Sequence, residues 1–357
     1  MTTASDQSPL QAAIVKLAHH SPISTQDATD AFGVIMRGEA TSLQVAAMLT
    51  GLRVRGETAE IVAGVVRAMR EVMVHLKAED ADALVDTCGT GGGALTTFNI
   101  STAAALLAAG AGVRIAKHGN RSFTSRCGSA DVLEALGVAI DVPLETMERA
   151  LDLAGIVFMY APLMHPAMRH VGAVRRELAI PTVMNVVGAL ANPAGARRQV
   201  VGVADPQRAL ILAGALLELD TLHSLVVHGE PGLDEISPLG LTRVVEVRGG
   251  TTSEWTIDPA EFGYSGFTGA ELAGGDLEDN ARIINDILGG RIEGRATAGA
   301  RAAVVMNAAA AIYVSGRVPT YAEGIAAAQQ ALDSGAALMT LDRLREAHGR
   351  RPTSSGE

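Results

Sequence analysis

The sequence predicts a small all-helical N-terminal domain, residues 1–78, followed by a larger α/β domain, residues 79–357, with a mostly parallel central sheet. Two observations predict this fold. Residues 1–78 contain four helical patterns and no strand signal, which is typical of a helical bundle. From residue 83 onward, short apolar runs alternate with helical patterns, which is the order expected for parallel strands joined by helices.

The N-terminal domain is expected to form its helices from apolar residues repeated at helical spacing. Ser24 or Thr25 can cap the second helix, and Thr41 and Thr58 stand where the next two begin. The expected helices cover residues 10–19, 24–37, 41–52 and 58–69. The charged segment 77–82 is expected to connect the two domains.

The α/β domain is expected to alternate strands and helices along its whole length. The expected strands are 84–86, 113–116, 156–158, 181–185, 199–203, 223–228 and 243–247. The expected helices are 101–110, 129–136, 145–154, 206–218, 277–288, 298–315 and 321–334. Residues 348–357 are polar and are expected to form a frayed tail.

A glycine-rich loop follows the first expected strand. Four of residues 89–93 are glycine, and the first of them stands three residues after the expected strand 84–86. Because glycine permits positive φ and has no Cβ, its N–H groups can approach an anion closely. Ser101 and Thr102 can cap the helix that follows, and a helix N-terminus attracts phosphate. The order predicts a phosphate cradle, with a tight turn as the alternative; the spacing fits neither GxxxxGK[ST] nor GxGxxG.

A second polar cluster is expected at the end of the next strand. Lys117, His118 and Asn120 follow residues 113–116, at the strand end where open α/β sheets bind ligands. Alone, this segment would be interpreted as a solvated basic turn. Two such loops after consecutive strands instead favour a site for a second anionic group.

The helix after this cluster carries two acids on one face. Ser129 is expected as its N-cap. Asp131 and Glu134 lie three residues apart and therefore share a helix face. The two carboxylates either orient Lys117 and Asn120 or are simply solvated.

Adjacent acids, Asp234 and Glu235, follow the expected strand 223–228. Magnesium prefers oxygen ligands and shares them with substrate phosphate, so a metal site is favoured over a solvated pair. His165 and His170 are five residues apart, which is not the i, i+4 spacing of a helical zinc site, and no third ligand is nearby.

Composition limits the classes of protein. The net charge of −10 and pI near 5.4 argue against a nucleic-acid or anionic-membrane surface, and 3% aromatic residues leave few stacking platforms. Cys88 and Cys127 supply neither a metal-ligand set nor a disulfide framework. The sequence shows no signal peptide and no apolar run of roughly 18 residues, so a cytoplasmic protein is expected.

Taken together and in order, four clusters resemble the anthranilate phosphoribosyltransferase family. The clusters are GTGG (89–92), NIST (99–102), KHGNR (117–121) and GSADVLEALG (128–137). The similarity continues through residues 175–178, 192–193 and 234–235, so it covers nearly the whole chain. The resemblance implies the fold of nucleoside phosphorylase type II and a homodimer.

The resemblance also implies a reaction. The 5-phosphoribosyl group would pass from 5-phosphoribosyl-1-diphosphate to the amine of anthranilate, giving N-(5-phosphoribosyl)anthranilate and diphosphate in tryptophan biosynthesis. An arylamine is already a neutral nucleophile, so we assign no catalytic acid or base. Catalysis would come from positioning and from stabilising the leaving diphosphate, with Mg²⁺, two ions per subunit, as the cofactor.

The resemblance assigns residues to three sets. The residues expected to bind phosphoribosyl diphosphate are Gly89, Gly92, Gly93, Thr97, Asn99, Ile100, Ser101, Thr102, Lys117, His118, Gly119, Asn120, Arg121, Ser122, Phe123, Thr124, Ser125 and Ser129. The residues expected to bind anthranilate are Gly89, Asn120 and Arg175. The residues expected to bind metal are Ser101, Asp234 and Glu235.

The chain departs from the family at two places. Gly93 replaces the family's usual aspartate, which bears on magnesium handling. Ala189 and Ala191 replace the usual proline and threonine, which bears on the shape of the acceptor pocket. The alternatives are a pyrimidine-nucleoside phosphorylase, which would need inorganic phosphate and no paired acids, and a non-catalytic nucleic-acid-binding relative, which would need a basic face.

Overall fold

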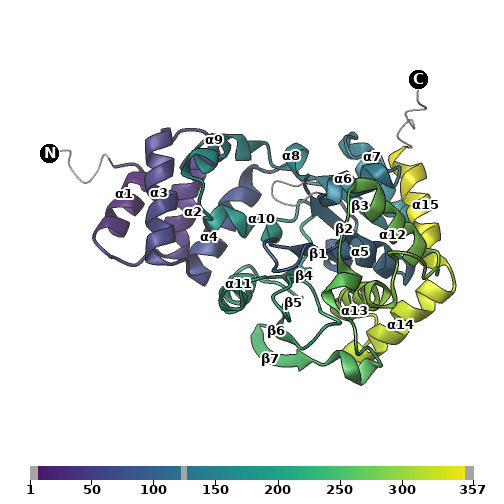
Figure 1. Ribbon diagram of the computed structural model, residues 1–357. Helices are drawn as coiled ribbons and strands as arrows, with labels where there is room; N and C mark the ends of the chain where they lie inside the picture. The colour runs from purple at the N-terminus through teal and green to yellow at the C-terminus, as the bar shows by residue number, and fades with distance from the viewer. Residues whose placement is uncertain (1–6, 122–126, 350–357) are drawn as a thin grey trace.

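The N-terminal part of the chain is a bundle of four helices, as the sequence predicts (Figure 1). The computed structural model describes residues 7–121 and 127–349. Ser24, Thr41 and Thr58 each accept a hydrogen bond from the backbone three residues later, which fixes where the last three helices begin. The helices are α1 (Pro9–Ala18), α2 (Thr25–Met36), α3 (Ser42–Arg55) and α4 (Ala59–Val72).

The rest of the chain is organised by one sheet with strand order β3-β2-β1-β4-β5-β6-β7. Neighbouring strands are parallel from β3 to β5, and β6 and β7 add antiparallel to the β5 edge. The strands are β1 (Leu84–Gly89), β2 (Arg114–Gly119), β3 (Ile156–Tyr160), β4 (Arg198–Gly202), β5 (His223–Gly229), β6 (Thr242–Arg248) and β7 (Thr251–Ile257). The mostly parallel sheet is therefore confirmed.

Helices join and cover these strands. They are α5 (Ile100–Gly110), α6 (Ser129–Ala135), α7 (Leu144–Ala154), α8 (Ala161–Met164), α9 (Arg169–Leu178), α10 (Val187–Leu190), α11 (Pro206–Glu218), α12 (Leu277–Leu288), α13 (Ala298–Val314), α14 (Tyr321–Asp333) and α15 (Ala336–His348). Five short 3₁₀ turns complete the elements: η1 (Ala81–Ala83), η2 (Pro166–Met168), η3 (Val183–Asn185), η4 (Pro259–Phe262) and η5 (Gly269–Leu272). None of the helices in the described part of the chain has both the length and the apolar character that crossing a membrane would need.

The sequence-based assignment was wrong at one strand and missed several elements. Residues 181–185 form no strand, because two bonds between Thr182 and Asn185 close the 3₁₀ turn η3. The Thr182 N–H donates to Asn185 Oδ1 at 3.0 Å, and the Asn185 N–H donates to the Thr182 carbonyl at 2.9 Å. The missed helices are α8, α9, α10 and α15, and the missed strand is β7 at the edge of the sheet. β7 reads as polar because only one of its edges is paired and most of its residues are exposed.

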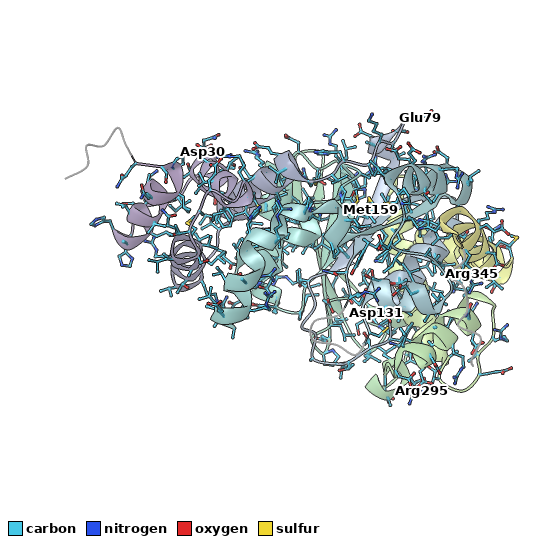
Figure 2. The ribbon with its side chains drawn as sticks, turned by 90° about the horizontal axis from the view of Figure 1, so that it is seen from above. Asp30, Glu79, Asp131, Met159, Arg295 and Arg345 are labelled. Atoms are coloured by element: carbon cyan, nitrogen blue, oxygen red, sulfur yellow. The ribbon has the colours of Figure 1, made fainter. Side chains whose placement is uncertain are left out.

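Both faces of the sheet are buried. One face packs alternate strand residues such as Val85 and Val200 against α5, α13 and α15. The other face packs Val201 and Val226 against α11, and that core continues into α1–α4. Seen from above, Asp30 in the bundle and Arg345 on α15 lie toward opposite ends of an elongated molecule (Figure 2). The domain boundary at residue 78 stays a prediction.

The chain order places a crevice at the centre of the sheet. Strands β1, β2 and β3 run outward in one direction, and β4 and β5 are added on the other side of β1. Open α/β sheets bind ligands outside the carboxyl ends of their strands at such a reversal of strand order. The loops that follow β1, β2 and β5 all leave from this edge, which is where the sequence predicts the site.

Candidate active site

The glycine loop after β1 is fastened to the loop after β5. The backbone N–H of Gly91 donates to Asp234 Oδ2 at 2.8 Å, and that of Ala94 donates to the Gly232 carbonyl at 2.8 Å. Gly91 has a φ of 73°, which a side chain would disfavour. At Gly89 a Cβ would collide with the Asp234 carboxylate. Glycine is therefore required where the two loops meet.

The start of α5 lies against the same pair of acids. Ser101 donates its backbone N–H to Glu235 Oε1 at 3.2 Å, and its hydroxyl accepts a bond of 2.7 Å from Lys117 Nζ. The lysine also donates to the Thr87 carbonyl at 2.5 Å. Ser101 does not cap α5 as expected, because the helix begins one residue earlier, after Asn99. Its hydroxyl is instead turned toward β1 and β2.

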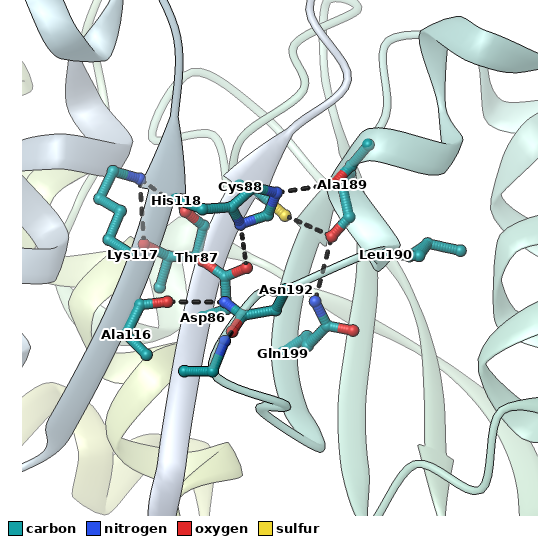
Figure 3. Close-up of polar contacts among 12 residues, drawn as sticks. Asp86, Thr87, Cys88, Ala116, Lys117, His118, Ala189, Leu190, Asn192 and Gln199 are labelled. Atoms are coloured by element: carbon teal, nitrogen blue, oxygen red, sulfur yellow. Dashed lines mark hydrogen bonds and ion pairs between the residues drawn. The ribbon is translucent and has the colours of Figure 1, made fainter. Parts of the chain in front are cut away.

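Lys117 and His118 lie in β2 rather than in a loop, because this strand runs to Gly119 and not to residue 116. Lys117 is only 4% exposed. Burial lowers the pKa of its ammonium, while attraction to Asp86 and Glu235 works in the opposite direction. The lysine thus points inward and donates to Thr87 near the end of β1, as Figure 3 shows. It also donates to Ser101 at the start of α5.

Asp234 and Glu235 form a pair of acids at the carboxyl end of β5. Burial, followed by repulsion from Asp234, raises the pKa of Glu235 to about 8, and Lys117 only partly opposes this. Burial also raises the pKa of Asp234. Two half-buried carboxylates that repel each other suit a divalent cation, which prefers such oxygen ligands.

We expect the metal-free protein to lose stability between about pH 5 and 8 because of Glu235. Its folded-state pKa of about 8 exceeds the ordinary value of 4.5, so the folded chain holds the proton more tightly than the unfolded chain. That contribution is full below the ordinary pKa and is lost as pH rises through the folded value. In the presence of a chelator, the melting temperature should fall more steeply with rising pH for the wild type than for Glu235→Gln. Parallel pH profiles would contradict the raised pKa.

The segment after β2 is anchored to α6. The Asn120 carbonyl accepts bonds from the backbone of Ala130 and from the Ser129 hydroxyl. Arg121 forms ion pairs with Asp131 at 2.9 Å and with Glu134 at 2.5 Å. The helix acids expected to orient Lys117 and Asn120 or to be solvated therefore bind this arginine.

Ser129 is the first residue of α6 rather than its N-cap, since Gly128 occupies the cap and Asp131 accepts its N–H. Four of the residues predicted to bind phosphoribosyl diphosphate lie outside the described residues: Ser122, Phe123, Thr124 and Ser125.

Several other residues predicted to bind phosphoribosyl diphosphate lie at the start of α5 or just before it. The Asn99 side chain donates to the Cys127 carbonyl and accepts from Asn280, which ties the loop to α12. Thr97 forms an isolated bridge with Ala273. Ile100 and Thr102 are buried in the first turn of α5, so their side chains stabilise the start of this helix.

Arg175 lies in the last turn of α9, which packs against α2 and α3. Burial lowers the pKa of its guanidinium. Within residues 7–121 and 127–349 no hydrogen bond or ion pair involves this guanidinium, and none joins Arg175 to Asn120 or Gly89. A half-buried guanidinium in this state is suited to an anionic ligand.

Sequence reasoning missed three residues that support the site. Asp86 is fully buried and lies 2.7 Å from His118 Nδ1, in an ion pair between β1 and β2. Asn307 on α13 makes two bonds of 2.9 Å with the backbone of Ile236, next to the acid pair. The signal for Asn307 was present, because it is the one amide in a helix of alanine and valine. Thr87 gave no signal, since its carbonyl receives the lysine.

Comparison with known proteins agrees with this arrangement. Residues 11–73 match the "Glycosyl transferase family, helical bundle domain", and residues 81–338 match the "Glycosyl transferase family, a/b domain". The anthranilate phosphoribosyltransferase of Rubrobacter xylanophilus is 50% identical over 94% of this chain and 96% of that protein.

Two solved structures are similar throughout. The anthranilate phosphoribosyltransferase of Thermus thermophilus superposes with a TM-score of 0.88 at 40% identity, covering 94% of this chain and 99% of that one. The Saccharomyces cerevisiae enzyme, solved in complex with PRPP and Mg, gives a TM-score of 0.84 at 28% identity, covering 97% and 98%.

A helical bundle joined to an α/β domain, with its polar loops at the centre of the sheet, defines a two-domain glycosyltransferase. Within that class the identity to curated relatives extends over nearly the full length. The chain belongs to the anthranilate phosphoribosyltransferase family. This result favours the transferase over the two alternatives, the nucleoside phosphorylase and the nucleic-acid-binding relative.

Proposed function

We propose that the chain transfers the phosphoribosyl group of 5-phosphoribosyl-1-diphosphate to anthranilate, giving N-(5-phosphoribosyl)anthranilate for tryptophan biosynthesis. One observation carries the proposal. The start of α5, strand β2 and the loop after β5 meet at Ser101, whose backbone N–H donates to Glu235 and whose hydroxyl accepts from Lys117. Such a cluster can hold a polyanion and its counter-ion together, and the family supplies the identity of both substrates.

The donor is proposed to lie across the glycine loop and the start of α5. The N–H groups of residues 92–93 and the α5 N-terminus suit the phosphate groups. The residues proposed for the donor site are Gly89, Gly92, Gly93, Thr97, Asn99, Ile100, Ser101, Thr102, Lys117, Gly119, Asn120, Arg121 and Ser122–Ser125 with Ser129. His118 is left out, because both of its ring nitrogens bond to the protein.

Magnesium is proposed as the cofactor, with two ions per subunit held by Ser101, Asp234 and Glu235. The donor set fits, as the mutual repulsion of the half-buried carboxylates indicates. When bound, the metal would neutralise charge that develops on the diphosphate. The yeast relative was solved with PRPP and Mg, which supports this assignment. The Gly93 backbone lies beside Asp234, so the family's aspartate at this position would add a third acid here.

The acceptor is proposed to lie between the end of β2 and α9, with its carboxylate on Arg175 and its ring near Asn120 and Gly89. The same yeast enzyme has been solved with 4-fluoroanthranilate, which supports a site for an aromatic acid. The protein's task is to place the arylamine opposite the leaving diphosphate and to exclude water. Lys117 would hold Ser101 and the end of β1 in place while the C1–O bond breaks and the C1–N bond forms.

The direct test is the loss of anthranilate fluorescence on mixing with phosphoribosyl diphosphate and magnesium. Consumption that requires all three components is expected. If anthranilate is unchanged while a pyrimidine nucleoside is cleaved by inorganic phosphate, the phosphorylase alternative is correct. A shift of single-stranded DNA without either reaction would favour the nucleic-acid-binding relative.

We also expect a homodimer held by the helical domain. Leu43 and Val54 on α3 are each 80% exposed, and Val15 on α1 is 42% exposed. Such apolar side chains on a small bundle suit a partner surface. Light scattering at micromolar concentration should give twice the chain mass of 36.8 kDa. Leu43→Glu with Val54→Glu should shift the mass to that of a monomer; a monomeric wild type would contradict the expectation.

A further inference from the structure

The short helix α10 is held in place by side chains from α4, β1, β2 and β4. Figure 3 shows those of Cys88, His118 and Gln199. A helix of four residues cannot satisfy its own last carbonyls. Three successive carbonyls of the α10 turn, which we define as residues 187–192, accept side-chain bonds instead. The bonds run from His118 Nε2 to Gly188 at 2.7 Å, from Cys88 Sγ and Gln199 Nε2 to Ala189 at 3.3 and 3.1 Å, and from Arg70 Nη2 to Leu190 at 2.7 Å.

His118 is charged by geometry. Its Nδ1 lies 2.7 Å from the Asp86 carboxylate and its Nε2 lies 2.7 Å from the Gly188 carbonyl, which can only accept. Burial opposes ionisation of Asp86, but the attraction and hydrogen bond of His118 lower its pKa, so this carboxylate is ionised and also only accepts. Each ring nitrogen must therefore carry a proton. Burial opposes the charged form, but Asp86 and the two hydrogen bonds outweigh it and raise the pKa of His118. Lys117 is a cationic neighbour and opposes the charge. The ring of His165 lies 6.4 Å from that of His118 between centroids, and burial, followed by repulsion from His118, lowers the pKa of His165 to about 4, so His165 is neutral at pH 7.

Holding a carbonyl with a buried ion pair carries a desolvation penalty for two charged groups. Asp86 is fully buried and His118 is 8% exposed, and well-packed apolar residues would often be at least as stable in their place. The pair connects the central strands of the sheet to one carbonyl of the turn. Asn192 continues the same attachment by donating to the Ala116 carbonyl at 2.7 Å. We infer that this arrangement fixes where the turn lies rather than adding to the stability of the fold.

We propose that Asp86 and His118 are positioning residues for the acceptor: they fix the α10 turn, which carries Ala189 and Ala191, the two positions that the family resemblance assigns to the acceptor pocket. The inference rests on the proposed function. It gives His118 a role that needs no contact with either substrate. It also makes Gln199 a second, independent support of the same turn.

The test replaces both members of the pair, Asp86→Leu with His118→Phe, so that no unpaired charge stays buried. The KM for anthranilate should rise about tenfold or more, the effect of losing a charge-assisted hydrogen bond, while the Kd for phosphoribosyl diphosphate changes by less than about twofold. Gln199→Leu should act in the same direction, by about threefold to tenfold.

A matched control is His348→Phe. His348 is also a buried histidine that bonds one backbone carbonyl, Ala139 at 2.9 Å, but it lies on α15. This variant should lower the melting temperature without changing either substrate constant. NMR of the wild type with ¹⁵N-labelled histidine should show two protonated nitrogens for His118 at pH 8, and the signature should be lost in Asp86→Asn.

These measurements distinguish failure of the proposed function from failure of the positioning role. A wild type without transferase activity refutes the proposed function itself. With an active wild type, the positioning role is overturned if the double variant and Gln199→Leu keep the normal anthranilate KM, if donor affinity falls equally, or if His118 is neutral. If the double variant does not fold, Gln199→Leu and the NMR signature decide the question.

Discussion

Asp234→Asn combined with Glu235→Gln is expected to lower kcat/KM by at least about a hundredfold. The amides keep the size of the side chains but cannot ionise, so the end of β5 can no longer offer two negative charges to a cation. A site that stabilises a developing phosphate charge through a cation is worth several kcal/mol, and each ~1.4 kcal/mol is a factor of ten in rate. Because Glu235 accepts from Ser101 and Asp234 accepts from Gly91, amides can preserve those two bonds. The loss should therefore come from charge and not from a collapsed loop.

Turnover should be measured across a magnesium titration for the double variant and for a matched control. Glu79→Gln with Asp80→Asn removes the same charge from two adjacent, exposed acids ahead of β1. The control should behave like the wild type at every magnesium concentration. Near-normal turnover of the Asp234–Glu235 variant at limiting magnesium would show that the metal is bound elsewhere.

Arg175→Ala is expected to lower kcat/KM for anthranilate by about 30-fold to several thousand-fold. Truncating one partner of a buried, hydrogen-bonded charge pair costs roughly 2–5 kcal/mol. Anthranilate carries its carboxylate ortho to the reacting amine, so a bidentate guanidinium would fix both the depth and the rotation of the ring. Arg175→Lys should recover only part of the loss, because a single ammonium cannot form two parallel bonds.

The same variant should leave the donor site nearly intact. Binding of phosphoribosyl diphosphate alone, measured by calorimetry, should change by much less than tenfold. Arg176→Ala, on the exposed neighbour of Arg175, is the control and should change neither constant. A collapse of donor affinity with an unchanged anthranilate KM would place Arg175 in the phosphate site and reverse the orientation of the whole pocket.

Local chemistry made much of the fold predictable. The hydroxyl caps at Ser24, Thr41 and Thr58 set three helix starts, and the apolar runs located β1 to β6. The error at residues 181–185 arose because the β-branched Thr182 and Val183 favour a strand, while the deciding bond between Thr182 and Asn185 is a matter of side-chain geometry. The edge strand β7 could not be predicted from an apolar run, because most of its residues are exposed and polar.

The site was predictable where residues of one kind are adjacent in the sequence. The glycine loop and the Asp234–Glu235 pair are such cases. Contacts between strands were not predictable in this way. Asp86 and His118 are 32 residues apart and meet only because β1 and β2 pair in parallel register. The same pairing draws Lys117 inward, so that a residue expected in an exposed loop lies buried against Thr87.

The most direct test of the account is to identify the product of the purified chain. With anthranilate, phosphoribosyl diphosphate and magnesium, mass spectrometry should detect N-(5-phosphoribosyl)anthranilate and an equal amount of diphosphate. Omitting magnesium, or replacing anthranilate with a pyrimidine base, should abolish product. Formation of a nucleoside or free base with inorganic phosphate, and no ribosylated anthranilate, would contradict the central claim.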